Sequence, residues 1–265
     1  MKMAVTETIF FCSRDGLRIR GMQFLPDAFD ASKAYPAVIL SHGFTGNYLS
    51  MEEWGRSFAE MGYAAFSFNF CGGGRLYEDE SIKSEGKTTD MTISTEIADL
   101  KAVKAYAVSQ PFVDPEHILL LGVSQGGFVS ALTAAECQKE VEKLILIYPA
   151  FCIPDHARKG CLGGATYPPD NVPETIDCGK TILGRCFYDD VVQRDPFREI
   201  SAYEGPVLII HGLDDQTVDY TYSVRAKESY KKGQCSLRLV PGMGHGYDEE
   251  QYQSMFETIR EFLKK

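Results

Sequence analysis

The fold class is decided by six consecutive residues, Gly122-Val123-Ser124-Gln125-Gly126-Gly127, which directly follow the apolar run Ile118–Leu121. A short apolar run is typical of a strand buried on both faces, and the spacing after the glycines is helical. In a tight turn between a strand and a helix, only small residues beside the serine allow the chain to pass so close to itself. The stretch therefore predicts that Ser124 stands on a strained corner, with its hydroxyl clear of the sheet.

Short apolar runs alternate with helical segments along most of the chain. The clearest helical pattern spans residues 93–107, where apolar residues recur at steps of 4, 3, 3 and 4. Near the start, Ser13–Gly16 separates the alternating runs Thr6–Cys12 and Leu17–Phe24, which is a hairpin signal. We therefore predict an α/β fold: a doubly wound, mostly parallel sheet with an N-terminal antiparallel hairpin. The runs expected as parallel strands are Ala37–Leu40, Ala64–Phe70, Ile118–Leu121, Leu144–Tyr148, Val207–Ile210 and Leu237–Val240.

The segment from Phe151 to Phe197 interrupts this alternation, because it is rich in glycine and proline and shows no sustained hydrophobic period. A long stretch without regular structure is unusual inside a compact domain, so we expect a cap inserted after the sixth strand. The expected organisation is a first part of the core at 1–150, a cap at 151–197 and a second part of the core at 198–265. A passive surface excursion is the alternative for this segment.

Charge and composition exclude several classes of function. Lys and Arg number 27 against 37 Asp and Glu, a formal net charge of −10, so no nucleic acid partner is expected. Membrane association is not expected either, since no apolar run reaches the roughly 18 residues that a spanning helix needs. The first residues, Met1–Glu7, lack the apolar segment of a secretory signal, so we expect a cytoplasmic protein. The sequence does not indicate an oligomeric state.

The eight cysteines are expected to be reduced thiols in that compartment. Four of them fall in the expected cap, at intervals of 9, 17 and 8, and none of these forms a C-x-x-C pair. A zinc site is therefore not expected, and we predict neither a metal nor an organic cofactor. The four are Cys152, Cys161, Cys178 and Cys186.

A serine hydroxyl attacks poorly until a base takes its proton, and that base needs a third group to fix its tautomer. His245 is the candidate base. It lies in a glycine-rich loop after the last expected strand, at the sheet edge where open α/β folds bind ligands. His42 and His211 both precede glycine at strand ends and are interpreted as structural, and His117 as a solvated strand start.

The acid that orients His245 is expected after the strand Val207–Ile210, where Asp214, Asp215 and Asp219 lie close together. Any of the three gives the chain order serine, acid, histidine, which is the order of one serine hydrolase fold. Sequence spacing alone does not separate the three acids.

Two backbone N–H groups are candidates for an oxyanion hole. Gln125 follows the serine at the start of the expected helix, and Phe44 lies in the stretch His42–Gly46, right after an expected strand. Two N–H groups aimed at one point stabilise the oxygen that becomes negative when an acyl carbon is attacked.

These motifs together resemble the α/β-hydrolase family, across essentially the whole chain outside the expected cap. The family pattern H-G-x-x-D-x-x-V is similar to His211–Val218, and its aspartate falls on Asp215. The resemblance implies a serine hydrolase whose triad is Ser124, Asp215 and His245. The other matching stretches, similar to the nucleophile elbow, the oxyanion loop and the histidine loop, are Gly122–Gly126, His42–Gly46 and Gly244-His245.

Within that family, the chain looks like bacterial feruloyl and cinnamoyl esterases, by the stretches His42–Gly46 and His245–Asp248 and the insert after the sixth strand. The resemblance implies a serine esterase that acts on small hydroxycinnamoyl esters and holds the aromatic acid with its cap. Two features depart from the pattern. The stretch Phe70–Arg75 replaces a Gly-x-Gly-x-Ser turn, and the cap cysteines have no counterpart.

Substrate contacts are expected in the cap, because an aromatic acid needs stacking surfaces and a polar partner. The candidates are Asp155, His156, Tyr167, Phe187 and Tyr188. Three alternatives stay open: an esterase or monoglyceride-type lipase for short aliphatic esters, an acyl-peptidase, and a non-catalytic binding protein of the same fold.

Overall fold

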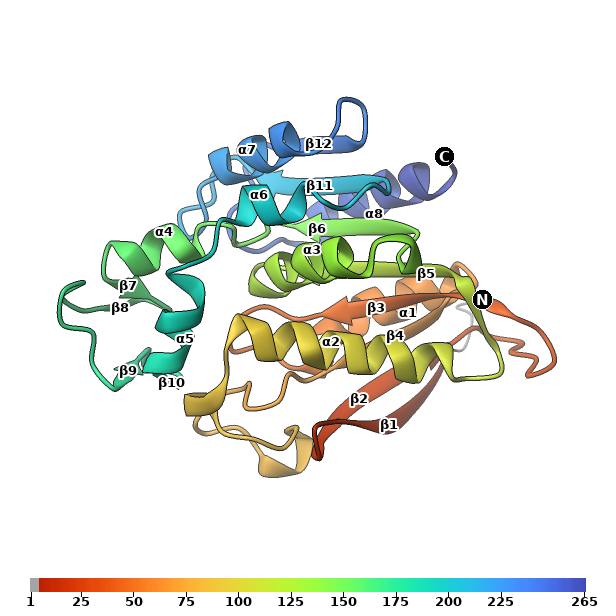
Figure 1. The fold of residues 1–265 in the computed structure, drawn as a ribbon. Coiled ribbons are helices and arrows are strands. Elements are labelled where there is room, and N and C mark those ends of the chain that lie inside the picture. The colour runs from red at the N-terminus through yellow and green to blue at the C-terminus, as the bar shows by residue number, and fades with distance from the viewer. Residues whose placement is uncertain (1–4) are drawn as a thin grey trace.

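The computed structural model describes residues 5–265. The prediction of a cytoplasmic location used Met1–Glu7, and the first four of those residues lie outside the described range. Within the described range, one sheet of eight strands is covered by helices on both faces (Figure 1). Its strands are β1 (Thr6–Arg14), β2 (Leu17–Leu25), β3 (Tyr35–Ser41), β4 (Ala64–Phe68), β5 (Val113–Val123), β6 (Lys143–Ile147), β11 (Val207–Gly212) and β12 (Cys235–Val240). Across the sheet they follow the order β1-β2-β4-β3-β5-β6-β11-β12, and every neighbouring pair from β4 to β12 is parallel.

The N-terminal hairpin is present as predicted. Strands β1 and β2 pair antiparallel with Arg14 opposite Leu17, so only Asp15 and Gly16 form the turn. Both turn residues have positive φ, 50° and 84°, which is the conformation that two-residue hairpin turns prefer. Strand β2 also runs antiparallel to β4, and all later strands are parallel. The predicted α/β fold with a mostly parallel, doubly wound sheet is confirmed.

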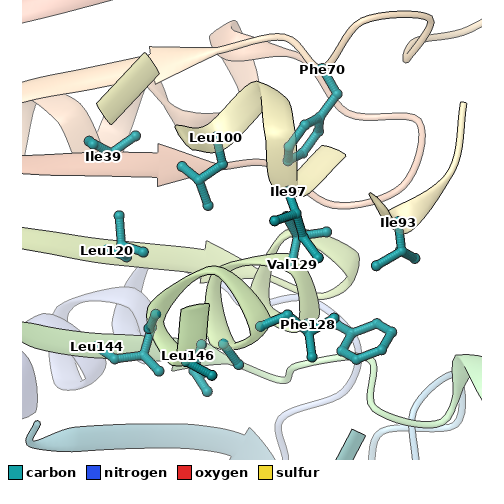
Figure 2. Close-up of a cluster of buried hydrophobic side chains, with 14 of the residues drawn as sticks. Ile39, Phe70, Ile93, Ile97, Leu100, Leu120, Phe128, Val129, Leu144 and Leu146 are labelled. Carbon is teal, nitrogen blue, oxygen red and sulfur yellow. The ribbon is translucent and has the colours of Figure 1, made fainter. Parts of the chain in front are cut away.

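Two helical layers explain why the parallel strands are wholly apolar. Alternate residues of one strand, such as Val38 and Leu40, pack with Trp54 and Phe256 under α1 (Glu52–Glu60) and α8 (Glu249–Leu263). Ile39, between them, points to the opposite face, which is covered by α2 (Ile93–Val108), α3 (Gln125–Cys137) and α7 (Thr221–Ser229). Figure 2 shows part of this second layer, where side chains of α2 and α3 meet those of β3, β5 and β6.

We call residues 151–197 the cap segment. In Figure 1 its elements gather beyond one end of the sheet, where the parallel strands finish. The boundaries of the cap stay a prediction. These elements are too short to produce a hydrophobic period in the sequence. They are α4 (Ile153–Arg158), β7 (Cys161–Leu162), β8 (Ala165–Thr166), β9 (Thr175–Asp177), β10 (Ile182–Gly184) and α5 (Arg185–Val191), with α6 (Pro196–Ile200) at the boundary.

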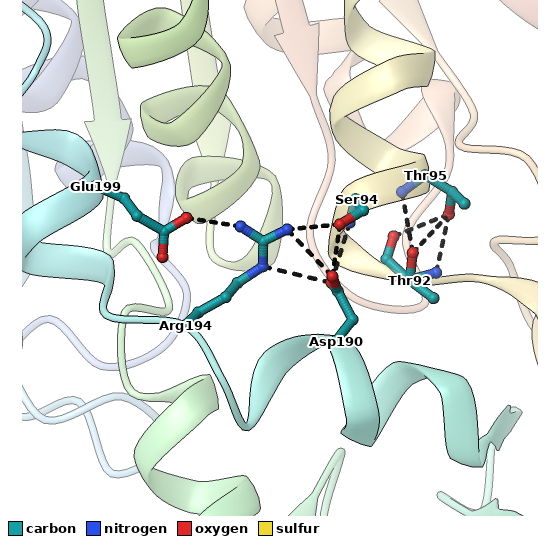
Figure 3. Close-up of polar contacts among 6 residues, drawn as sticks. All are labelled: Thr92, Ser94, Thr95, Asp190, Arg194 and Glu199. Carbon is teal, nitrogen blue, oxygen red and sulfur yellow. Dashed lines mark hydrogen bonds and ion pairs between the residues drawn. The ribbon is translucent and has the colours of Figure 1, made fainter.

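A network of polar contacts ties the cap segment to the start of α2 (Figure 3). Arg194 contacts Asp190 of α5 at 3.2 Å and Glu199 of α6 at 2.7 Å. Asp190 in turn accepts hydrogen bonds from the Ser94 hydroxyl at 2.5 Å and the Ser94 N–H at 3.1 Å. The Ser94 N–H is free to donate because it lies in the first turn of α2, where backbone donors have no partner inside the helix. The network therefore fixes α5 against the core.

Short 3₁₀ turns complete the described chain: η1 (Tyr48–Met51), η2 (Glu80–Ile82), η3 (Thr88–Asp90) and η4 (Gln138–Glu140). Among residues 5–265, no helix is both long enough and apolar enough to cross a membrane.

Candidate active site

Ser124 lies at the turn between β5 and α3. Its backbone has φ 54° and ψ −119°, a conformation that residues other than glycine rarely adopt. A Cβ on Gly126 would lie 2.3 Å from the Ser41 carbonyl oxygen, and one on Gly122 would lie 2.2 Å from the Gly126 oxygen. Only glycine fits at these two positions. Holding a serine in such a conformation costs about 1–3 kcal/mol, which the surrounding packing must offset. The strained corner that the sequence predicts is therefore present.

Ser124, His245 and Asp215 form one chain of hydrogen bonds. Ser124 Oγ lies 2.9 Å from His245 Nε2, and His245 Nδ1 lies 2.7 Å from Asp215 Oδ2. The three residues come from the loops that follow β5, β12 and β11, so they meet at the carboxyl-terminal edge of the sheet. Because Nδ1–H donates to the carboxylate, Nε2 carries the free lone pair and accepts from the serine hydroxyl. This arrangement can take a proton from Ser124.

The Asp215 side chain is fully buried and has several hydrogen-bond donors around it. The N–H groups of Thr217 and Val218 donate to Oδ1 at 2.8 and 2.9 Å, and His211 Nε2 lies 3.3 Å from Oδ2. Burial alone would raise the pKa of Asp215, but hydrogen bonds from His211, His245 and the Val218 N–H outweigh it and hold the pKa below its ordinary value. Asp215 is therefore ionised at neutral pH, and its negative charge lies directly against the His245 ring.

The competing acids have other partners. Asp214 accepts a hydrogen bond from the Gly242 N–H at 2.7 Å, and Asp219 accepts from the Thr221 N–H at 2.8 Å. Of the three acids left open by spacing, Asp215 is the one that contacts His245.

His42 and His211 are buried and satisfied by neighbours. Nδ1 of His42 donates to the Gly43 carbonyl oxygen at 2.8 Å, and its Nε2 accepts from the Phe70 N–H at 3.4 Å. Burial lowers the pKa of His42 to about 4, so the ring is neutral. Nδ1 of His211 lies 2.6 Å from the Ser223 hydroxyl. These contacts join strand ends to neighbouring loops, which agrees with the structural interpretation of both histidines.

The N–H groups of Phe44 and Gln125 donate no hydrogen bond to any of the described residues. Both residues line the same cavity as Ser124. A Cβ on Gly43 would lie 3.2 Å from Ser124 Cβ, so the loop that follows β3 passes directly against the serine at this glycine. Free N–H donors beside a serine are the groups that an oxyanion requires.

A cavity of about 970 Å³ is lined by Ser124, His245 and Phe44 together with residues of the cap segment. Its volume is at the upper end of the range for small-molecule sites, and such sites combine apolar walls with a few polar groups. The polar side chains on its wall include His156, Lys180, Gln216 and Thr217. Its large apolar lining residues are Phe44, Val123, Ile153, Leu162, Leu183, Phe187 and Val218.

Two of the five expected substrate contacts, His156 of α4 and Phe187 of α5, line this cavity. Sequence reasoning missed Tyr148, whose ring centroid lies 4.7 Å from that of His245, and Lys180 in the turn between β9 and β10. Tyr148 ends an apolar strand, so its pattern predicted only burial. Three cap cysteines also reach the wall: Cys152, Cys161 and Cys178. Among residues 5–265, no group of His, Cys, Asp and Glu is arranged to hold a metal.

The other three expected contacts lie outside the cavity wall. The Asp155 carboxylate accepts hydrogen bonds from the Arg158 guanidinium at 2.9 Å and from the Tyr222 hydroxyl at 3.0 Å. Tyr167 is buried, and its ring packs edge-on against that of Tyr188 with centroids 5.9 Å apart. These side chains therefore stabilise the packing of the cap segment, because their polar groups and rings contact neighbouring residues of the protein.

The unusual turn Phe70–Arg75 reaches the rim of the cavity. The Arg75 side chain donates to the Thr45 carbonyl oxygen at 3.2 Å, and the next residue, Leu76, donates its N–H to the Lys180 carbonyl oxygen at 2.9 Å. Thr45 and Lys180 both line the cavity. The turn therefore bridges the loop after β3 and the cap segment.

Comparison with known proteins places this geometry among serine hydrolases. Residues 32–169 match the family model described as Hydrolase_4, serine aminopeptidase, S33. Est1E from Butyrivibrio proteoclasticus, solved with ferulic acid bound, is 29% identical with a TM-score of 0.83, over 97% of this chain and 100% of that one. A putative carboxymethylenebutenolidase of Synechocystis sp. is 30% identical, over 93% of this chain and 88% of its own length. The acylamino-acid-releasing enzyme of Homo sapiens is 20% identical over 90% of this chain, which spans only 32% of that protein.

Proposed function

Because the chain belongs to the serine aminopeptidase S33 family and is a serine esterase of the α/β-hydrolase type, we propose that it hydrolyses carboxylic esters through an acyl-enzyme on Ser124. The observation that carries the proposal is the hydrogen-bond chain from Ser124 through His245 to Asp215. The free N–H groups of Phe44 and Gln125 beside it support the same chemistry. In this proposal the three side chains are the catalytic triad and the two N–H groups are the oxyanion hole.

In the first half-reaction, Ser124 Oγ forms a bond to the ester carbonyl carbon while His245 takes the hydroxyl proton. Asp215 keeps the ring oriented and stabilises the imidazolium, and the two N–H groups bind the carbonyl oxygen as it becomes negative. His245 then gives its proton to the alkoxy oxygen, and the alcohol leaves. In the second half-reaction, water gives a proton to His245 and attacks the acyl carbon. The carboxylic acid departs as Ser124 regains its proton.

The first prediction concerns Ser124→Ala, which removes the nucleophile. Hydrolysis of p-nitrophenyl acetate is expected to fall by about 10⁴-fold or more, with the circular dichroism spectrum and melting temperature preserved. The matched control is Ser130→Ala, because Ser130 is buried on α3 and its hydroxyl has no partner among the described residues. Wild-type turnover by Ser124→Ala would rule out the proposal.

A fluorophosphonate probe separates an enzyme from a non-catalytic binding protein of the same fold, because only an activated serine reacts with it. The proposal expects one adduct per wild-type chain and none on Ser124→Ala. A wild-type chain that stays unlabelled, with its fold intact, would favour the binding protein.

For the acyl group, we propose a hydroxycinnamoyl moiety. The apolar wall contains the half-buried ring of Phe44, with the buried Phe187 packed into the same wall, and His156 there offers a polar partner for a phenol. The similarity to Est1E, solved with ferulic acid bound, supports the same class of acyl group. A short aliphatic ester leaves most of a cavity of this volume empty.

The second prediction compares methyl ferulate with methyl butyrate. The kcat/KM for ferulate is expected to be at least about tenfold higher, because the larger acyl group buries more apolar surface in the cavity. Phe187→Ala should lower kcat/KM for methyl ferulate more than for methyl butyrate. The activity of the variant on methyl butyrate also serves as the control for folding. A preference for butyrate would reject the aromatic acyl group and favour an aliphatic carboxylesterase or monoglyceride-type lipase.

An acyl-peptidase is the second candidate, favoured by the description of the matched family and by the human relative. The discriminating substrate is N-acetyl-alanine p-nitroanilide, compared with the p-nitrophenyl ester of the same acid. Hydrolysis of the anilide at a rate close to that of the ester would favour this candidate. Esterase activity with a negligible anilide rate would reject it.

We also infer a cytoplasmic location, without a nucleic acid or membrane partner. The net charge of −10 and the eight free cysteines support this proposal. Cell fractionation tests it: the ester hydrolysis should be found with cytosolic marker enzymes, and recovery outside the cytosol would contradict the location.

A further inference from the structure

Glu96 is a buried carboxyl group that the mechanism above does not use. It lies in the first turn of α2 and is only 2% exposed. Its two oxygens lie 2.8 and 2.9 Å from Nε2 of Gln125, the residue that follows the nucleophile. A glutamate this deep is almost always ion-paired, yet Glu96 forms no salt bridge within the described part of the chain. Its only side-chain partner there is a neutral amide.

A second, much smaller cavity connects Glu96 with the loop that carries the other oxyanion donor. This space of about 10 Å³, roughly the volume that one water needs, is lined by Glu96, Gln125, Phe44 and Thr181 among others. The Thr181 hydroxyl is buried and has no hydrogen-bond partner among the described residues. Phe44 and Gln125 also line the large cavity, so these two residues separate the small cavity, which Glu96 lines, from the large one that Ser124 lines.

We propose that Glu96 is a positioning residue of the oxyanion hole, which holds Gln125 in place as a neutral carboxylic acid. This inference rests on the proposed function. A neutral acid accepts the Nε2–H of Gln125 on its carbonyl oxygen without adding charge, and the Thr181 hydroxyl on the same small cavity, which has no partner among the described residues, is the acceptor available for the acid's own O–H. A carboxylate at the same place would put negative charge behind the donors that must stabilise an oxyanion, and it would weaken them.

The surroundings of Glu96 favour the neutral form. Burial is the largest influence, the hydrogen bond from Gln125 opposes it, and the negative charges of Asp99 and Asp190 act in the same direction as burial. Together they raise the pKa of Glu96 to about 8. His42, on the wall of the small cavity, adds no positive charge, because burial lowers its pKa to about 4.

The arginines that pair with Asp99 and Asp190 form no ion pair with Glu96. Arg14 contacts Asp99 at 2.7 Å, and Arg194 contacts Asp190 at 3.2 Å. Each arginine therefore balances the acid that faces Glu96 rather than Glu96 itself.

The test compares pH–rate profiles of the wild type and Glu96→Gln, which keeps a neutral hydrogen-bonding group of the same size. The wild-type kcat is expected to fall about tenfold through a midpoint near pH 8, with little change in KM. Glu96→Gln should keep kcat at pH 7 within about threefold of the wild type and show no such fall. Glu136→Gln, an exposed glutamate at the end of α3, should follow the wild type and controls for charge removal.

Two kinetic outcomes overturn the proposal: a wild-type kcat that does not fall through pH 8, or a fall that persists in Glu96→Gln. A spectroscopic measurement keeps the proposal separate from the proposed function. The infrared difference spectrum, wild type minus Glu96→Gln, should contain a protonated carboxyl band at pH 6 that disappears above pH 9. A carboxylate band at pH 6 overturns the proposal even if the protein is an active esterase. If the wild type hydrolyses no ester at any pH, that result contradicts the proposed function instead.

Discussion

Asp214 and Asp215 are neighbours in the chain, but their carboxylates serve different parts of the site. Asp215 is buried against His245, whereas Asp214 binds the Gly242 N–H and so holds the start of the histidine loop. Both therefore contact the loop that carries His245, the proposed base. Only Asp215 touches the ring, and only its charge is placed to stabilise an imidazolium.

The third prediction separates these two roles. Asp215→Asn should lower kcat by about 10⁴-fold, because the amide removes the charge and favours the wrong tautomer of His245. Asp214→Asn retains an oxygen that accepts from Gly242, so kcat should stay within about tenfold of the wild type. Steady-state kinetics on one ester at pH 7.5 measure both. Equal losses in the two variants would contradict the assignment of Asp215.

Individual residues of the candidate site could be predicted where the backbone restricts the choice. Gly122 and Gly126 have no room for a Cβ, so the glycines on either side of Ser124 in the sequence already indicate the tight turn in which it lies. Spacing could not choose between Asp214 and Asp215, because a loop can turn either side chain toward the base. Composition could not separate the cavity-wall residues from the rest of the cap segment: Tyr167 looks as suitable as Phe187 in the sequence, but of the two only Phe187 lines the cavity.

The cap segment is fixed to the core by a few half-buried polar contacts. Arg194 is 14% exposed in its side chain and links Asp190 of α5 to Glu199 of α6, and Asp190 is bound to Ser94 of α2. One oxygen of Glu199 is already buried without a partner within the described residues. Removing the guanidinium would leave two acids close together without a counter-charge.

The fourth prediction is that Arg194→Ala loosens the cap segment. We expect a loss of about 1–3 kcal/mol in the free energy of unfolding and a higher KM for methyl ferulate, with kcat changed less. Urea denaturation and steady-state kinetics measure the two effects. The matched control is Arg185→Ala on α5, whose side chain is 46% exposed and whose ion pairs should contribute little. Equal effects of the two substitutions would show that the network does not hold the cap segment.

The main strands and helices could be predicted because they are long enough to show a period, and because both faces of the parallel strands are covered. Strand β5 illustrates this: Leu119 and Leu121 pack on one face, and Ile118 and Leu120 on the other. Strands β7 and β8 contain two residues each, and β9 and β10 three each, so no period can exist there. Their positions depend on contacts with the core rather than on local pattern.

The buried Glu96 makes the stability of the whole molecule depend on pH, and this is the fifth prediction. Its pKa is raised from 4.5 to about 8, so the folded chain keeps a proton that the unfolded chain releases. The contribution of Glu96 to stability is complete below the unfolded pKa and is lost as the pH rises through the folded pKa. Glu96→Gln should therefore gain several kcal/mol relative to the wild type between pH 4.5 and pH 8. Urea unfolding at both pH values measures this, and a constant difference between the two proteins would contradict it.

The chain as a whole combines a strongly negative charge with a cavity that suits a largely neutral ester. The net charge of −10 disfavours polyanionic ligands, whereas an apolar acyl group is bound mainly by contact with the cavity wall. Affinity for methyl ferulate should accordingly depend little on ionic strength.

The central claim, that an ester is cleaved through an acyl group on Ser124, is tested most directly by trapping that intermediate. Wild-type protein is mixed with excess p-nitrophenyl ester of ferulic acid, quenched in acid within milliseconds and analysed by peptide mass spectrometry. The account predicts a burst of about one p-nitrophenol per chain and a feruloyl adduct on the peptide that contains Ser124, both absent in Ser124→Ala. Turnover of the ester with an acyl group on another residue, or a burst that survives in Ser124→Ala, would contradict it.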